Sequence, residues 1–338
     1  MSGTKRPLSR PAAARAASAR ERRAASKASS AAAARAHTAA VRKQLGRLRD
    51  RVVTARTLKR YKRHVAQFYE WCRLHGIQLA LRTDDFDMQV SAWAECLWSE
   101  GDPKSVFGNG LCGLQHLVPG LRGRLHGSWR LHATWGRCEP AAQVPPLTRT
   151  MVQGIAGFFC RKGWKDIAIM ILTAFHCILR TAEMLKLLVG DCVIGKDTIV
   201  LTLRDTKIGV RTGIHQTVDI DDPWLVACFS AMVQDKQRGQ RLVSCDPATF
   251  RKRWKQALKA LRIPAVYNPY GLRRGGATSL FLHTGSFDRV MEKGRWRSLH
   301  AMRQYLDLSM EKLAADTEHS AFEHVCFQEA RQLHSLAM

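Results

Sequence analysis

The chain has 338 residues, of which 46% are hydrophobic, so it is long enough for two ordinary domains with apolar cores. Its formal net charge is +26, and residues 1–50 contribute only +11 of it, so the other 288 residues still carry +15. A charge this large, spread over the whole chain, predicts a polyanionic partner, nucleic acid before a membrane surface. It excludes a neutral enzyme that carries a basic tail.

The cysteines and the apolar stretches exclude other classes. The ten cysteines are scattered singly without a CxxC pair, which argues against a structural zinc site. Several lie in apolar helical patterns, as expected of small core residues in a reducing compartment. The longest apolar stretch, near Ile167–Leu179, contains His176 and is too short to span a bilayer. We expect no membrane association and a location with DNA, in the nucleus or nucleoid.

Residues 1–48 consist mainly of Ala, Arg and Ser, with almost no large apolar side chains. Such a segment cannot bury a core, so we predict a disordered basic tail. Three roles stay open for it: a solvated tail without a role of its own, a DNA-binding arm or nuclear address around Arg20–Arg23, and an organelle transit peptide.

An all-helical domain is predicted for residues 49–140, with helices near 57–76, 87–99 and 106–117. The first has an apolar stripe formed by Leu58, Tyr61, Val65, Phe68 and Cys72. Thr57 is its predicted N-cap and Gly76 its predicted end. Its other faces carry Lys59, Arg60, Lys62, Arg63 and His64. We expect the lysines and arginines to contact DNA phosphates.

Residues 141–146 are predicted to be an extended linker because prolines surround and end this segment. A second domain is predicted for residues 147–338, with helices over 147–163 and 164–191. Thr198–Leu203 and Gly213–Ile220 are predicted strands of an antiparallel hairpin, and helices follow to the C-terminus. The predicted fold class is mainly α, with a small antiparallel sheet in an α+β second domain.

Four short motifs follow one another in the second domain. ILRTAEMLKL contains Arg180 and Glu183, DTKIGV places Lys207 on the hairpin turn, YGLR contains Tyr270 and Arg273, and GRWRSLHAMRQY places Tyr305 nine residues after Trp296. In this order and spacing they resemble the catalytic motifs of the tyrosine recombinase (phage integrase) family. The resemblance covers roughly residues 147–310. The preceding helical domain resembles the family's core-binding domain less closely.

The resemblance implies a site-specific recombinase or integrase that cleaves and rejoins DNA through a 3′-phosphotyrosyl bond. Tyr305 would be the nucleophile, and covalent catalysis of this kind divides one difficult step into two easier ones. Arg180 and Arg273 would clamp the phosphate, because a guanidinium is always charged and makes paired, planar hydrogen bonds. The reaction would need neither a metal nor a nucleotide cofactor.

The remaining residues of the motifs would assist. Lys207 would protonate the leaving 5′ oxygen, and Trp296 would donate its indole N–H to the phosphate. Glu183 would orient Arg180, and Arg274 would contact DNA. Gly275 and Gly276 follow these arginines, and we expect them to let the helix pack closely on neighbouring backbone.

One residue departs from the family pattern. The third motif usually opens with His, and here it opens with Tyr270. A phenol donates a hydrogen bond but, with an ordinary pKa of about 10, is a poorer proton shuttle than imidazole at neutral pH. We keep Tyr270 in the predicted catalytic set and expect cleavage that is slowed or lost.

Double-stranded DNA is the implied partner, with a homotetramer on DNA and a monomer or weak oligomer in free solution. Two other functions stay open. A decayed mobile-element recombinase would only bind DNA, which Tyr270 favours, and a type IB topoisomerase-like enzyme would relax DNA at no particular sequence. The C-terminal helical tail either docks on a neighbouring protomer, as in the family, or covers its own domain.

Overall fold

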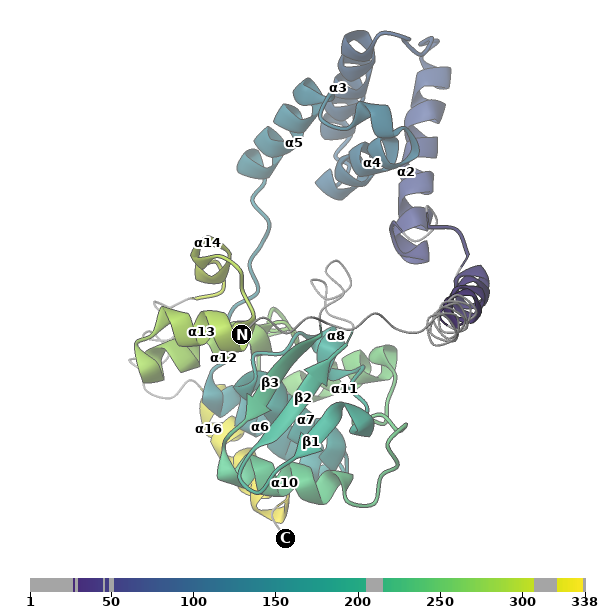
Figure 1. The fold of residues 1–338 in the computed structure, drawn as a ribbon. Coiled ribbons are helices and arrows are strands. Elements are labelled where there is room, and N and C mark those ends of the chain that lie inside the picture. Colours follow the sequence, from purple (N-terminus) through teal and green to yellow (C-terminus); the bar gives the residue numbers. More distant parts are fainter. Residues whose placement is uncertain are drawn as a thin grey trace, which may run out of the picture. The chain divides into compact units, whose positions relative to one another are not determined.

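The computed structural model describes residues 27, 30–44, 46–48, 52–204, 215–306 and 321–336. It divides into two compact units, Met1–Ala141 and Ala142–Met338 (Figure 1). Among the described residues, no helix is both long and apolar enough to cross a bilayer. Residues 30–44, in the predicted tail, form a helix whose residues are all exposed. Alanine favours a helix there, and the full exposure agrees with a tail that packs on neither core.

The described part of the N-terminal unit is all-helical, as predicted. Besides the helix over residues 30–44, it contains α2 (Ala55–Leu74), α3 (Thr83–Ser99), α4 (Lys104–Leu117), the short 3-10 helix η2 (Pro119–Leu121) and α5 (His126–Cys138). Large side chains from α2, α3 and α4 fill its core, where Phe68, Trp93, Phe107 and Leu111 are at most 1% exposed. Rings of neighbouring helices meet directly, with the Phe68 and Trp93 ring centroids 5.4 Å apart.

Two details of α2 differ from the prediction. The N-cap is Thr54 and not Thr57, because the Thr54 hydroxyl accepts a hydrogen bond from the backbone N–H of Thr57 at 3.2 Å. His64, predicted on a polar face, is buried because it lies four residues before Phe68 and so on the same side of the helix as that buried ring. The Nδ1 atom of His64 lies 2.7 Å from Oε1 of Gln67, which satisfies its polar ring.

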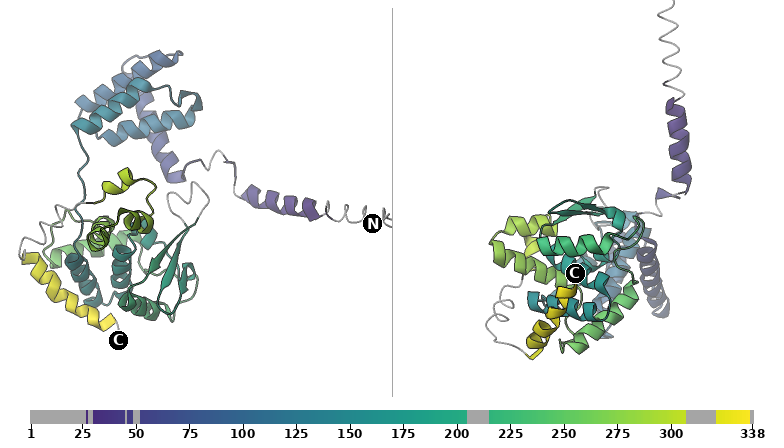
Figure 2. Two further views of the ribbon diagram at one scale, coloured as in Figure 1. Left: turned by 60° about the vertical axis from the view of Figure 1, so that its left-hand side comes forward. Right: turned by 90° about the horizontal axis from the view of Figure 1, so that it is seen from below.

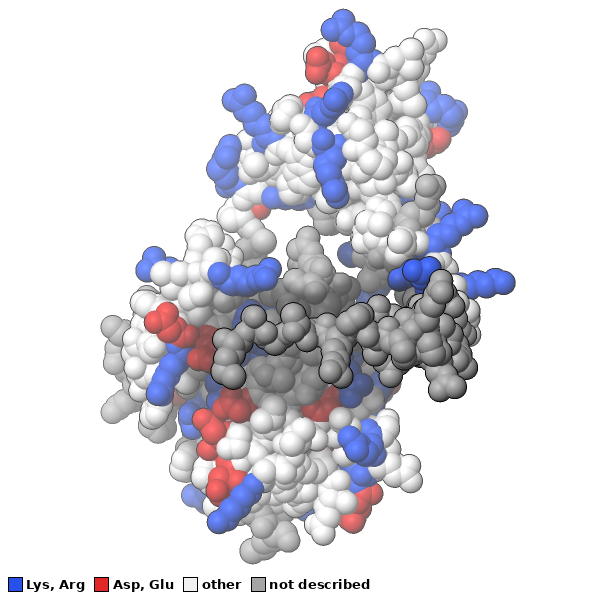
Figure 3. All heavy atoms as spheres, viewed as in Figure 1, with Lys and Arg blue, Asp and Glu red and all other residues white. Residues whose placement is uncertain are grey.

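Four exposed cations lie on the side of α2 away from its buried stripe, and we call them the basic face of α2. Its members are Lys59, Arg60, Lys62 and Arg63, all of which are exposed. Figure 3 shows Lys and Arg side chains spread over the visible surface of the N-terminal unit, with few acidic side chains between them. The position of these cations opposite the buried stripe follows from the 3.6-residue period of the helix.

The C-terminal unit joins helices to one small sheet. Its elements are α6 (Arg149–Arg161), α7 (Lys165–His176), α8 (Thr181–Met184), η3 (Val189–Asp191), β1 (Cys192–Ile194), β2 (Ile199–Leu203), β3 (Gln216–Ile220), α10 (Pro223–Val233), α11 (Pro247–Ala260), α12 (Gly271–Thr284), α13 (Phe287–Gly294), α14 (Leu299–Arg303), α16 (Ala321–Ala330) and η4 (Arg331–Leu336). Figure 2 shows the sheet on one side of α6 and α7 and α16 on the other.

The predicted hairpin is confirmed, and the sheet has one further strand. β2 pairs antiparallel with β3, so that Leu201 lies opposite Val218, and β1 pairs antiparallel with the other edge of β2. β2 alternates between buried and half-buried residues, which is the pattern of a strand with one face on the core. β1 has three residues, none of them buried, which is too short a pattern to predict.

The continuous helix predicted over residues 164–191 is wrong. The helix α7 ends at His176, and α8 begins only at Thr181. Between them Ile178 has a φ of 51°, the left-handed region that a β-branched residue rarely adopts. Its side chain is fully buried in a cluster with Ala277, Val290 and Met302, so tertiary packing outweighs the local preference for a helix. The break makes Arg180 the N-cap residue of α8.

The predicted close packing at the start of α12 is confirmed. A Cβ atom on Gly275 would lie 1.9 Å from the carbonyl oxygen of Leu147. A Cβ atom on Gly276 would lie 2.2 Å from the carbonyl oxygen of Phe175. Only glycine therefore lets α12 approach the backbone at the start of α6 and the end of α7 this closely.

The C-terminal helix α16 packs against α6 of its own chain. Cys326 is fully buried, and Arg161 donates a 2.5 Å hydrogen bond to Glu329. Two glycines of α6 allow the approach: a Cβ on Gly154 would lie 2.6 Å from the Cα of Cys326, and one on Gly157 would lie 2.1 Å from the carbonyl oxygen of Glu329. In this chain the tail covers its own domain.

Replacing Gly157 by Ala should detach α16 from this surface, because the new methyl group meets backbone that cannot rotate away. We expect the free energy of unfolding to fall by about 1–3 kcal/mol, the usual effect of overpacking. Chemical denaturation measures the change, and limited proteolysis reports release of the tail. Gly239→Ala is the matched control, since no atom lies within 4 Å of that Cβ. Equal stability of both variants would contradict the packing described.

Candidate active site

Arg273 lies at the centre of the predicted site, on the first turn of α12. Its side chain is fully buried, and its guanidinium donates to two backbone carbonyls, Ile178 at 2.5 Å and Gly294 at 2.7 Å. The guanidinium carbon lies 4.3 Å from the ring centroid of Trp296 and 5.5 Å from that of Tyr305. The fold therefore gathers the end of α7, the start of α12 and the segment after α13 around one cation.

The charge of Arg273 lacks a partner anion in the described part of the chain. Burial, followed by the positive charges of Arg180 and Arg295, lowers the pKa of Arg273 to about 9, so it is still protonated at pH 7. No described residue forms an ion pair with it, and its buried Nε has no acceptor among the described residues. A buried cation without an ion-pair partner favours the binding of an anion, because the anion compensates its charge.

Glu183 collects donors from two sides of the site. Its carboxylate accepts hydrogen bonds from the backbone N–H of Arg180 at 2.8 Å, from Nη1 of Arg180 at 2.5 Å and from Nη2 of Arg295 at 2.9 Å. Burial opposes its ionisation, but Arg295 and Arg180 outweigh this effect and hold the pKa of Glu183 below its usual value. The structure brings Glu183 and Arg180 together as predicted.

Arg295 is a residue of the site that the sequence motifs did not identify. Its side chain is 5% exposed and donates to Glu183, to Cys177 and Ile178 carbonyls, and to the carbonyl of Lys293. Its φ is 58°, again in the left-handed region. The only signal in the sequence was its place directly before Trp296, in a stretch where another arginine follows.

The carbonyl group of Ile178 joins two of these arginines. It accepts from Arg273 at 2.5 Å and from Arg295 at 3.3 Å. Left-handed backbone at a β-branched residue is energetically unfavourable, by about 1–3 kcal/mol, and persists where the surrounding contacts impose it. The break between α7 and α8 therefore points the carbonyl of Ile178 toward Arg273 and Arg295.

Two phenols meet in front of Arg273. Tyr270 donates a hydrogen bond from its hydroxyl to the hydroxyl oxygen of Tyr305 at 2.7 Å. Burial opposes ionisation of Tyr305, but this hydrogen bond and the charges of Arg273 and Arg180 outweigh it, so the pKa of Tyr305 lies below its usual value. Burial and the bond to Tyr305 raise the pKa of Tyr270 to about 12. Tyr305 is the phenol that is prepared to carry negative charge.

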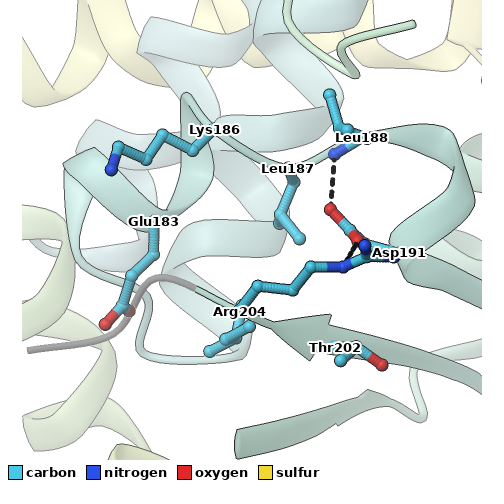
Figure 4. Close-up of a pocket in the computed structure, with 8 residues that line it drawn as sticks. Glu183, Lys186, Leu187, Leu188, Asp191, Thr202 and Arg204 are labelled. Carbon is cyan, nitrogen blue, oxygen red and sulfur yellow. Dashed lines mark hydrogen bonds and ion pairs between the residues drawn. The ribbon is translucent and has the colours of Figure 1, made fainter. Parts of the chain in front are cut away.

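One other predicted site residue, Arg274, makes a contact outside this cluster. Arg274 is only 5% exposed and donates to Oε1 of Gln143 at 2.7 Å, a contact within the C-terminal unit, so its DNA contact stays a prediction. Lys207 lies outside the described residues. Arg204 is the last described residue before it. Arg204 forms an ion pair with Asp191, and both line a cavity of about 150 Å³ that Glu183 also lines (Figure 4).

Replacing Tyr270 by Phe should raise the pKa of Tyr305, because the phenolate then loses its hydrogen-bond donor. Tyrosinate absorbance, followed as the pH rises, measures this ionisation. The difference from Tyr305→Phe isolates Tyr305 among the five tyrosines. The control is Tyr69→Phe, which removes a phenol of equal exposure, 40%, from the other unit. A pKa of Tyr305 that is the same in both variants would show that the hydrogen bond does not favour ionisation.

The described structure is similar to that of the Tn1549 transposon integrase in complex with transposon right end DNA. The TM-score is 0.53 at 12% sequence identity, over 78% of this chain and 95% of that chain. For the same integrase with a circular intermediate DNA, the TM-score is 0.50 at 12% identity, over 68% of this chain and 85% of that chain. For the XerH site-specific recombinase bound to difH substrate, the TM-score is 0.47 at 13% identity, over 69% of this chain and 70% of that chain.

No protein-family model and no curated protein matches the sequence. The structural similarity at these low identities concerns the fold. The chain has the tyrosine recombinase fold.

Proposed function

We propose that the chain is a site-specific DNA recombinase or integrase that cleaves and rejoins DNA through a covalent bond to Tyr305. One observation carries this proposal: the hydroxyl of Tyr305, whose pKa is lowered, lies beside the buried guanidinium of Arg273, a cation without an ion-pair partner among the described residues. A nucleophile and an anion site in one place suit attack on a phosphodiester.

The proposed step exchanges one phosphoester bond for another. The oxygen of Tyr305 loses its proton to solvent and attacks the phosphorus atom, forming the bond from the phenol oxygen to phosphorus. The bond from phosphorus to the 5′ oxygen breaks, and that oxygen takes up a proton, for which we propose Lys207 as the donor. Attack by a 5′ hydroxyl on the phosphotyrosyl bond is the reverse reaction and rejoins a strand. No net oxidation or hydrolysis occurs.

The arginines supply the charge stabilisation. The pentacoordinate phosphorus of the transition state carries one more negative charge than the phosphodiester, and guanidinium groups held in advance stabilise that increase. Arg273 is fixed by two carbonyls and Arg180 by Glu183, so neither needs to reorganise during the reaction. The Trp296 ring packs against the guanidinium of Arg273 and against the ring of Tyr305. The centroids of the Trp296 and Tyr305 rings are 4.8 Å apart.

Tyr270 would assist as a donor of a hydrogen bond. The Tyr270 hydroxyl already donates to the Tyr305 oxygen, where negative charge builds up when that oxygen is deprotonated. With a pKa of about 12, Tyr270 keeps its proton at neutral pH and does not act as the base. The substitution of tyrosine for the usual histidine therefore changes the kind of help given to the nucleophile without removing it.

We propose duplex DNA as the partner. The compared Tn1549 integrase structures are DNA complexes, and this chain carries a net charge of +26. The basic face of α2 is the surface of the N-terminal unit that we propose for phosphate contacts. A homotetramer on DNA is part of the proposal, because exchange between two duplexes needs four cleaved strands.

Incubation with a pool of nicked duplexes, without added metal, should yield protein covalently bound to DNA. Because of the nick, the piece of strand that carries the new 5′ hydroxyl is short and diffuses away after cleavage. Rejoining then cannot occur, so the adduct accumulates. Denaturing gels detect it, and Tyr305→Phe should abolish it because phenylalanine has no nucleophilic oxygen. Sequencing the trapped DNA identifies the preferred site.

Three other outcomes would separate the alternatives. Tight, salt-sensitive binding without an adduct, on DNA that carries the chain's own target, would favour a decayed recombinase. Relaxation of supercoiled plasmid at no particular sequence would favour a topoisomerase. An adduct that persists in Tyr305→Phe would contradict the assignment of the nucleophile.

Affinity for duplex DNA should fall steeply as salt rises, because cations of the protein displace counterions from phosphates. Replacing the four residues of the basic face of α2 by glutamine should reduce the slope of log affinity against log salt by about 0.9 for each phosphate that the variant no longer neutralises. Fluorescence anisotropy over a salt series measures this slope. Arg73→Gln is the control on the same helix, since Glu70 already pairs with Arg73 at 2.6 Å. An unchanged slope in the fourfold variant would exclude this face.

A further inference from the structure

Arg295 and Arg180 hold the same carboxylate from opposite ends. Glu183 Oε1 accepts from Arg180 at 2.5 Å, and Oε2 accepts from Arg295 at 2.9 Å. The Glu183–Arg295 pair is buried, with each side chain 5% exposed, whereas the Arg180 side chain is 27% exposed. Arg295 therefore reaches Glu183 from inside the protein, and Arg180 is the one of the two arginines that a ligand can contact.

The charges of this cluster do not balance. Three guanidiniums, on Arg180, Arg273 and Arg295, lie near Glu183, whose carboxylate forms ion pairs with Arg180 and Arg295 and acts on Arg273 only through its charge. The excess is two positive charges, which equals the two negative charges on a pentacoordinate phosphorus attacked by a phenolate. Without Arg295, Glu183 would cancel most of the field of Arg180, and one positive charge would be left over.

The backbone of Arg295 adds an independent observation. Its φ of 58° is unusual for a residue with a side chain, and strain of this kind clusters at functional sites when surrounding contacts impose it. Arg262 has the same φ of 58°, but it is exposed and lies at the end of α11. Only Arg295 uses the conformation to bury a guanidinium, which bonds to Glu183 and to the Ile178 carbonyl that Arg273 also uses.

We propose that Arg295 is a positioning residue that neutralises Glu183 from the buried side, so that the full charges of Arg180 and Arg273 act on the phosphate. The inference rests on the proposed function, since the phosphate is that of the cleaved strand. Glu183 orients Arg180, and Arg295 prevents the orienting carboxylate from weakening it. Arg295 itself does not touch the DNA.

The test is a double-mutant cycle on Arg295 and Glu183. Arg295→Met removes the buried charge and keeps an apolar stem of similar length. The rate of adduct formation at saturating DNA, measured per folded protein well below each unfolding temperature, should fall about 100-fold. Adding Glu183→Gln restores the excess of two positive charges, and the double variant should recover about 10-fold of that loss. Arg262→Met is the control with the same residue type and φ, and its rate should equal that of the wild type.

A purely structural role of Arg295 would give a different result. Arg295→Met would then lower the unfolding temperature but would not change the pH of half-maximal cleavage by the folded protein. Our account predicts that the pH of half-maximal cleavage rises in Arg295→Met, because Tyr305 loses positive potential, and returns toward the wild-type value in the double variant. A single-variant rate equal to wild type, or a double variant no faster than the single, would overturn the inference.

A second readout keeps the inference separate from the proposed function. Inorganic phosphate, added at constant ionic strength, should raise the unfolding temperature of the wild type more than that of Arg295→Met, with the difference regained in the double variant. If the wild type forms no adduct, the proposed function fails, and this phosphate series still decides the role of Arg295. Equal phosphate effects in all three proteins would overturn that role.

Discussion

The burial of the Arg273 guanidinium is the constraint on which the candidate site depends. A buried cation must be hydrogen-bonded, and its two acceptors are backbone carbonyls from distant parts of the chain, Ile178 and Gly294. The chain meets this requirement by breaking the helix after α7 and by ending α13 beside α12. Gly275 and Gly276, on the turn after Arg273, permit the close approach of α12 to the backbone of Leu147 and Phe175. Trp296 and Tyr305 follow Gly294 and are therefore delivered to the same cation.

The site is polarised before any ligand binds. Glu183 is held by two arginines, Arg273 by carbonyls, and Tyr305 by the hydroxyl of Tyr270. Each of these contacts places positive charge or a donor where a phosphate and a phenolate would be stabilised. This order of the site before a ligand binds is the physical reason for proposing cleavage chemistry there, because donors that need not reorganise are the effective ones.

The sequence predicted many of the helices and two of the three strands, because periodicity is a local signal, and its motifs predicted which residues gather around Arg273. Apolar periodicity gave the helices, alternation gave β2 and β3, and motif spacing brought Arg180, Glu183, Arg273, Trp296 and Tyr305 to one place. The break at Ile178 and the role of Arg295 could not be predicted, because both depend on left-handed backbone that only tertiary contacts impose. The partner of Tyr270 was likewise a contact between residues 35 positions apart.

The central claim is that this network makes Tyr305, and not its neighbour Tyr270, the nucleophile. The most direct measurement is to isolate the covalent adduct, digest its DNA and protein, and locate the remaining nucleotide by mass spectrometry. Because Tyr270 donates and Tyr305 accepts their shared hydrogen bond, the account predicts a nucleotide on Tyr305 alone. A nucleotide on Tyr270, or on any residue other than Tyr305, would contradict it.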